Sequence, residues 1–405
     1  MKLTPTFTTG KMKMMFNILL GCSQQMSEVV HDTYNKNEEI NIKDMLARFT
    51  TDVISSCAFG LESNSCKNPD EEFRKYGKTV LDFSTYEVLR NSISTVLPDL
   101  CRALGVILVK PHVAKFFYNT IKNTVDYREK NNIYRKDFLQ MLIDMKNHNV
   151  NNNNEKKQEV GMTLNEMAAE AFAFYVGGFE TSSSTMTFAF IEMALNQDVQ
   201  QRARENVREV LDRHNGEISY EALQEMTYVQ QVIDETLRKY PIVPLIVRQC
   251  VKDYKIENTD TIIDKGTRLF IPTYAIHRDP DNFPEPEQFD PDRFSPENKR
   301  DIKPFTYLPF GDGPRNCIGL RFGLMQSKLG IATVLKDFKF TLNEKTKMPM
   351  EFNHHNFVLE PQVDSIPTAS QGTIFSKPCT YPKFHEEEVK RQINDMLNNS
   401  KLGGP

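Results

Sequence analysis

The chain has 405 residues, of which 39% are apolar and 26% are charged, and its formal net charge is −4. This composition is typical of a globular protein with a sizeable core, and the slight negative charge gives no reason to expect a nucleic-acid partner. Seven cysteines without a CxxC pair indicate a reducing compartment rather than a disulfide framework. Because no run approaches about 18 apolar residues, we expect no membrane-spanning segment in the chain as written.

The first third of the chain is predicted to be helical. Residues 17–146 contain few glycines and show no strand-like alternation of apolar and polar positions. The segment 147–157, which holds six asparagines and has no periodicity, predicts a surface loop.

A long helix is predicted after this loop. The capping box Thr163-Leu164-Asn165-Glu166 marks its start, and the helical pattern continues to about Leu195. Gly177 and Gly178 interrupt its middle, where each glycine costs about 1 kcal/mol relative to alanine. Two missing side chains would leave room for a flat ligand or a small gas molecule beside Glu180 and Thr181. A glycine-lined crossing of two helices is the alternative.

The next elements are predicted to be two helices and two strands. Residues 197–213 indicate a charged surface helix, and residues 228–240 indicate a helix carrying Glu235 and Arg238 one turn apart. Short strands are expected at 246–251 and 267–272. We interpret His277 as structural, because core or turn histidines outnumber metal ligands.

A glycine-rich loop with one cysteine follows at 310–323. Apolar residues then recur at helical spacing, which places Cys317 at a helix N-terminus. The helix dipole and the nearby Arg315 favour a thiolate there, and the arginine fork suits a carboxylate. One thiolate beside such an arginine fits haem better than zinc, which takes three or four protein ligands. A buried cysteine in a turn is the alternative.

The residues around this cysteine form a specific pattern, F-x-x-G-x-R-x-C-x-G, made by Phe310, Gly313, Arg315, Cys317 and Gly319. Chance would produce it roughly once in a million starting positions. The pattern resembles the haem-binding signature of the cytochrome P-450 family, and the chain is most similar to insect microsomal members. The resemblance implies that Cys317 is the axial iron ligand, that Arg315 pairs with a haem propionate and that Phe310 shields the sulfur.

The resemblance extends to other segments in the same order. Gly178-Phe179-Glu180-Thr181 matches the family's oxygen-activating segment, which implies that Thr181 holds a water or hydroperoxide at the iron and that Glu180 relays protons. Arg248 is implied as a second propionate partner. Glu235, Arg238 and Arg293 are implied to form a buried salt bridge that locks the cysteine loop. The glycines assigned to the cofactor site are Gly178, Gly311 and Gly319.

The fold that this resemblance implies is mainly α with a small β portion, and the catalytic domain is expected to span residues 1–361. The segment 2–7 resembles a point inside the family's third helix, so we expect an N-terminal truncation. We also expect the family's closing C-terminal hairpin to be lacking. Residues 362–405 are predicted to be an unrelated or divergent tail. Part of this tail resembles the opening of a reverse-transcriptase region of gypsy-like retroelements, and an ordinary amphipathic tail is the alternative.

The implied function is monooxygenation of a lipophilic small molecule by O2. It would use heme b and an NADPH-dependent flavoprotein reductase at the cytosolic face of the endoplasmic reticulum membrane. Two alternatives stay open. One is a truncated or chimeric haem-binding product without turnover. The other is a haem-thiolate isomerase or dehydratase, against which Glu180 and Thr181 argue.

Overall fold

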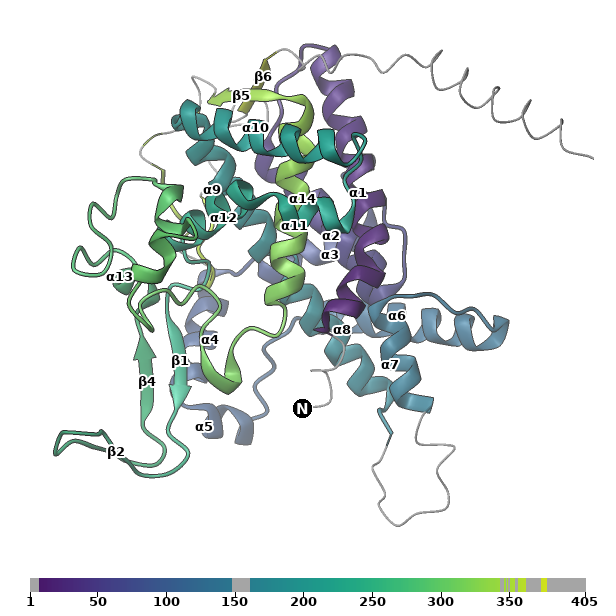
Figure 1. Ribbon diagram of the computed structural model, residues 1–405. Coiled ribbons are helices and arrows are strands. Elements are labelled where there is room, and N and C mark those ends of the chain that lie inside the picture. The colour runs from purple at the N-terminus through teal and green to yellow at the C-terminus, as the bar shows by residue number, and fades with distance from the viewer. Residues whose placement is uncertain are drawn as a thin grey trace, which may run out of the picture.

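The computed structural model describes residues 7–147, 161–342, 346, 348, 350–353, 356–361 and 373–376. Its first half is a succession of helices, as predicted (Figure 1). They are α1 (Thr9–Asn35), α2 (Ile42–Ile54), the π-helix η2 (Ser55–Phe59), α3 (Glu72–Leu81), α4 (Thr85–Val96), α5 (Pro98–Ala103), α6 (Pro111–Asn131) and α7 (Phe138–Asn147).

The second half adds longer helices and short strands. The helices are α8 (Leu164–Gly178), α9 (Glu180–Leu195), α10 (Gln197–Arg213), α11 (Tyr220–Glu225), α12 (Thr227–Lys239), α13 (Thr273–Ile276) and α14 (Leu320–Asp337). Three short 3₁₀ turns accompany them: η3 (Pro291–Phe294), η4 (Asn298–Asp301) and η5 (Gly313–Arg315). The predicted helices at 197–213 and 228–240 are therefore confirmed, and so is the mainly α fold class.

The strands form three separate antiparallel pairs. β1 (Ile246–Gln249) pairs with β4 (Arg268–Ile271), which confirms the predicted strands in register Ile246 to Ile271. β2 (Tyr254–Lys255) pairs with β3 (Ile262–Ile263) at the tip of that hairpin. β5 (Lys339–Leu342) pairs with β6 (Thr373–Ser376). Four residues of the predicted tail therefore form one strand of this pair. The rest of the retroelement resemblance and most of the loop predicted at 147–157 lie outside the described residues.

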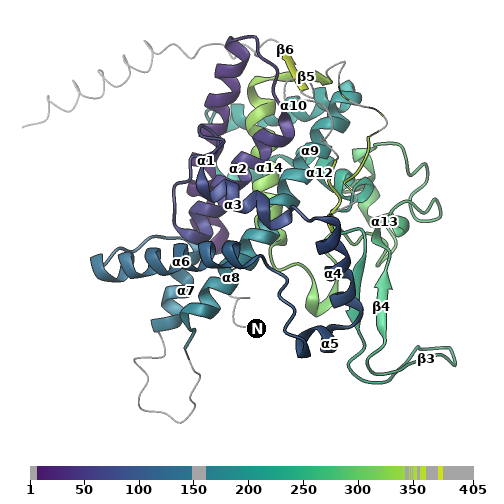
Figure 2. The same cartoon turned by 180° about the vertical axis from the view of Figure 1, so that it is seen from behind.

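Helix α9 is the centre of the core. It packs against α2, α12 and α14, and α1 packs on the other side of α14 (Figures 1 and 2). Most of its side chains, from Ser182 to Ala194, are buried. A helix that is covered on all faces needs no polar side, and the sequence of α9 accordingly shows little amphipathic pattern. The position of α9 is set by the helices that pack around it. Over the described residues, no helix is long and apolar enough to cross a membrane.

The long helix predicted from 163 to 195 is divided in two. Its start is confirmed, since Glu166 N–H donates to Thr163 Oγ1 at 3.2 Å and Thr163 N–H donates to the Glu166 carboxylate at 2.7 Å. The prediction of one continuous helix is wrong, because α8 ends at Gly178 and α9 begins at Glu180. The Thr181 hydroxyl donates to the Gly177 carbonyl at 2.6 Å. A side chain that binds into the backbone ladder is a recognised cause of a helix kink.

Candidate active site

The kink forms one wall of an apolar cavity of about 420 Å³. The opposite wall is the loop that precedes α14, and residues 242–248 close a third side. The predicted site residues that line the cavity are Gly178, Thr181, Arg248, Phe310, Gly311, Cys317 and Gly319. The structure therefore brings together residues that are about 140 positions apart in the chain.

Local backbone chemistry shapes the cysteine loop. Gly311 and Gly313 have φ values of +67° and +72°, which side-chain-bearing residues rarely adopt. Asp312 accepts a hydrogen bond from Gly313 N–H, and Cys317 N–H donates to the Phe310 carbonyl at 2.8 Å. The loop is thus folded back on itself, which presents Cys317 to the cavity.

The protein groups around Cys317 act on its thiol in opposite directions. Burial raises the pKa of the thiol, and the N–H groups of Gly319 and Leu320 offset this only in part. The helix begins at Leu320, three residues beyond the cysteine, so the dipole acts from a distance. A bound metal ion would add positive charge, because a coordinating thiol is deprotonated. The thiolate expected from the helix N-terminus and Arg315 stays a prediction.

Arg248 and Arg315 meet at the edge of the cavity. The Arg248 guanidinium donates to the Arg315 carbonyl at 3.1 Å, and a Cβ added at Gly311 would lie 3.4 Å from Arg248 Nη2. Arg248 lines the cavity, whereas the Arg315 side chain is exposed and lies outside that lining. Two arginines near one rim suit a ligand that carries carboxylates.

The two glycines of the kink have different surroundings. A Cβ added at Gly177 would meet nothing within 4 Å, so this position opens to the cavity. A Cβ added at Gly178 would lie 2.6 Å from Ile54 Cδ1 at the end of α2. The structure therefore gives Gly178 a packing contact with Ile54 in addition to its place in the cavity lining.

Glu180 and Thr181 point to different sides of α9. The Thr181 side chain lines the cavity, but Glu180 is absent from its described lining. The Glu180 carboxylate is hydrogen-bonded to Lys43 on α2 and to the Ser184 hydroxyl, the latter at 2.7 Å. The sequence held no signal for Lys43, since it lies 137 positions from Glu180.

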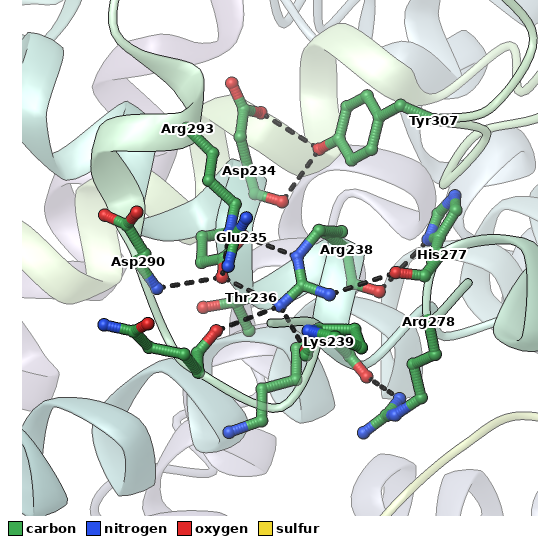
Figure 3. Close-up of polar contacts among 12 residues, drawn as sticks. Asp234, Glu235, Thr236, Arg238, Lys239, His277, Arg278, Asp290, Arg293 and Tyr307 are labelled. Atoms are coloured by element: carbon green, nitrogen blue, oxygen red, sulfur yellow. Dashed lines mark hydrogen bonds and ion pairs between the residues drawn. The ribbon is translucent and has the colours of Figure 1, made fainter. Parts of the chain in front are cut away.

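A buried charge network lies behind the cysteine loop (Figure 3). Arg238 binds Glu235 through two hydrogen bonds of 2.7 and 2.9 Å, and Arg293 Nε lies 3.6 Å from Glu235 Oε1. Burial raises the pKa of Glu235 while the Arg238 charge opposes this. Asp292, the residue before Arg293, pairs with Arg202 outside this network.

His277 connects this network to the cysteine loop. Leu308 N–H donates to His277 Nε2 at 2.7 Å, so Nδ1 carries the proton and donates to the Arg238 carbonyl at 3.1 Å. Burial lowers the pKa of His277 to about 4. The interpretation of His277 as a structural residue agrees with these contacts. Its link to Leu308, two residues before Phe310, was not anticipated.

The cavity has the donor set of a haem pocket. Within the part of the chain that the structure describes, no group of three or more histidine, cysteine or acidic side chains could hold a metal ion. Cys317 is the cysteine in the cavity lining, and the walls are mostly apolar with an open glycine opposite the sulfur. One axial thiolate is what a haem iron needs when the macrocycle supplies the other ligands. The residues present therefore fit a haem.

A mainly helical fold with a single cysteine loop facing an apolar cavity defines a haem-thiolate enzyme. Residues 2–367 match the family model of cytochrome P450. The chain is 44% identical over 360 residues to probable cytochrome P450 6a13 of Drosophila melanogaster, covering 89% of this chain and 71% of that relative. It is 46% identical over 366 residues to cytochrome P450 6A1 of Musca domestica, with coverage of 89% and 71%. The chain belongs to the cytochrome P450 family.

The family membership confirms a haem-thiolate monooxygenase of insect type with a haem cofactor. The match runs to residue 367, which is beyond the predicted domain boundary at 361. That boundary remains a prediction. These comparisons give no support to a retroelement origin for the tail.

Proposed function

We propose that this monooxygenase inserts one atom of O2 into a lipophilic small molecule, with electrons from an NADPH-dependent flavoprotein reductase and heme b as cofactor. The observation that carries this proposal is the position of Cys317. It lines an apolar cavity whose wall also holds Gly177 and Thr181. When bound, the haem supplies dioxygen activation and oxygen-atom transfer.

The protein residues have distinct parts in this proposal. The Cys317 sulfur holds the iron, with the Phe310 side chain beside it in the cavity wall. Arg248 and Arg315 hold the haem carboxylates at the rim. Thr181 offers a hydroxyl to the oxygen-binding side of the cavity, and its bond to the Gly177 carbonyl orients that hydroxyl.

The lining of the cavity supports a lipophilic substrate. The apolar side chains that line it include Phe7, Phe138, Phe174, Leu245, Val247 and Leu324. Glu170 and Arg248 are the charged residues of this described lining. Burying apolar substrate surface stabilises binding by about 25 cal/mol per Å².

The surface of α4 and α5 supports the proposed location at a membrane. The apolar residues exposed there and in the following turn are Tyr86, Leu89, Ile93, Val96, Leu97, Leu100, Leu104, Ile107 and Leu108. These helices lie at the end of the molecule that also carries β1 and β4 (Figures 1 and 2). We infer that they contact lipid. Phosphatidylcholine vesicles should sediment the wild-type protein but not L89E/L104E, and equal sedimentation would contradict the inference.

The central test is a carbon monoxide difference spectrum of the reduced, haem-loaded protein. Thiolate ligation gives a red-shifted Soret band, which Cys317→Ala should abolish. Cys250→Ala is the matched control, because Cys250 is a half-buried cysteine outside the cavity lining. An unchanged band in Cys317→Ala would refute the assignment. Turnover of a lipophilic probe without any reductant would instead favour the isomerase or dehydratase alternative.

A further inference from the structure

A cluster of two carboxyls and one ammonium lies next to the kink on the side away from the cavity. It consists of Lys43 at the start of α2, Glu180 and Ser184 on α9, and Glu360, and we name it the Lys43 cluster. The side chains of Lys43, Glu180 and Glu360 are only 15%, 8% and 15% exposed. Charged groups this buried need partners that compensate the loss of water.

The contacts inside the Lys43 cluster converge on one carboxylate oxygen. Lys43 Nζ donates to Glu180 Oε1 and, at 2.9 Å, to Ser184 Oγ. The Ser184 hydroxyl donates to the same Glu180 oxygen at 2.7 Å. Glu360 is more distant from the cation, with its Oε2 4.0 Å from Lys43 Nζ. Glu180 therefore receives most of the stabilisation that the single ammonium can provide.

The two carboxyls also interact electrostatically with each other. Two buried carboxylates beside one ammonium leave one negative charge uncompensated, and a proton on one of them removes that charge. The side-chain amides of Asn353 and Asn356 donate to Glu360 from its own segment. Among the described residues, Lys43 supplies the one positive charge of the cluster. Tyr175 on α8 is the neighbouring titratable group that senses the Glu180 charge.

The electrostatics assign the proton to Glu360. Burial opposes ionisation of Glu180, but the Lys43 charge and the hydrogen bonds from Lys43 and Ser184 outweigh it and lower the pKa of Glu180. Burial and the Glu180 charge raise the pKa of Glu360 to about 7. Two close carboxyls whose pKa values are pushed apart are a known arrangement for holding and transferring a proton.

The Lys43 cluster is connected to the cavity at two points. Glu180 precedes Thr181, which lines the cavity. Leu359 N–H, next to Glu360, donates to the Ile242 carbonyl at 2.8 Å, and Ile242 is also a lining residue. The chain therefore continues from both carboxyls of the Lys43 cluster to segments that line or contact the cavity wall.

We propose that Glu180 and Glu360 share one proton, held on Glu360, with Lys43 keeping Glu180 charged. As the pH rises, the proton leaves the Glu360 carboxyl for water, and Glu360 is left as a carboxylate. The shared proton does not depend on the proposed function of Thr181.

The shared proton is testable without turnover by infrared spectroscopy of the folded chain. A protonated-carboxyl C=O band should be present at pH 6, shift in D2O and disappear with a midpoint near pH 7. Glu360→Gln should remove it. Glu192→Gln is the matched control that should keep it, because Glu192 is a buried α9 carboxylate that contacts Lys239 and Tyr240 and no second carboxyl among the described residues.

Lys43→Met provides a second variant. Without the ammonium, the pair gives up its proton less readily, so the band should persist to higher pH. Absence of the band in the wild type at pH 6, or its survival in Glu360→Gln, would overturn the shared proton. The same midpoint in Lys43→Met would overturn the role of Lys43.

Discussion

Two buried charge clusters flank the active site, and they are built in opposite ways. Around Glu235, two arginines face one carboxylate, and Arg238 also donates to the carbonyls of His277 and Pro286 at 3.0 and 2.8 Å. Around Lys43, two carboxyls face one ammonium. In the cluster around Glu235, the arginines compensate the charge of the carboxylate. In the Lys43 cluster, one ammonium cannot compensate two carboxylates, so the charges balance only when one carboxyl carries a proton. The ratio of donors to carboxylates therefore separates a structural cluster from a titratable one.

The largest expected loss of stability comes from breaking the cluster around Glu235. Arg238→Met should destabilise the protein by about 3–5 kcal/mol, because it leaves a buried carboxylate without its cation. Urea unfolding measures the loss. The matched control is Arg202→Met, which removes an exposed pair with Asp292 and should cost about 1 kcal/mol or less. Equal losses in the two variants would contradict the structural role of Arg238.

A smaller loss is expected from Lys43→Met, about 2–4 kcal/mol at pH 8, since Glu180 keeps the Ser184 hydroxyl as a partner. At pH 6 the loss should shrink, because Glu180 can then take up a proton and become neutral. Urea unfolding at the two pH values separates this cluster from that around Glu235. A loss independent of pH would show that the carboxyls do not compensate by protonation.

The third prediction concerns the pH dependence of stability. Glu360 has a folded pKa of about 7, above the ordinary value of 4.5, so the folded state binds the proton more tightly. Its contribution is fully present below about pH 4.5 and is lost as pH rises through about 7, by about 1–3 kcal/mol. Glu360→Gln should remove this part of the pH dependence. Parallel stability curves for wild type and Glu360→Gln between pH 5 and 8.5 would contradict it.

The smallest expected changes in stability test the kink between α8 and α9, which lies between the Lys43 cluster and the cavity. Gly178→Ala should destabilise by about 1–3 kcal/mol, because its Cβ would press on Ile54 and move the end of α8 from α2. Gly177→Ala is the matched variant and should be neutral or stabilise by up to about 1 kcal/mol. Thermal unfolding compares them. The reverse order would contradict the close packing of Gly178 on Ile54.

Several features of the site could be predicted because they depend on neighbouring residues. The capping box at Thr163, the short strands and the cysteine loop each follow from local hydrogen bonding or backbone conformation. The family pattern around Cys317 added the order of the other motifs. The orientation of Glu180 could not be predicted, because adjacent residues of a helix point to different sides and only packing decides which side faces a ligand.

The sequence by itself determined the family, the helical class and the loop that carries Cys317, since these are written in contiguous residues and in their spacing. Only the tertiary structure decided that the long helix breaks at Phe179, that Gly178 packs the end of α8 against Ile54 and that Glu180 joins Lys43 and Glu360. The physical reason is burial. An ion pair or a shared proton gains its strength from the exclusion of water, and water is excluded only when segments distant in the chain pack together.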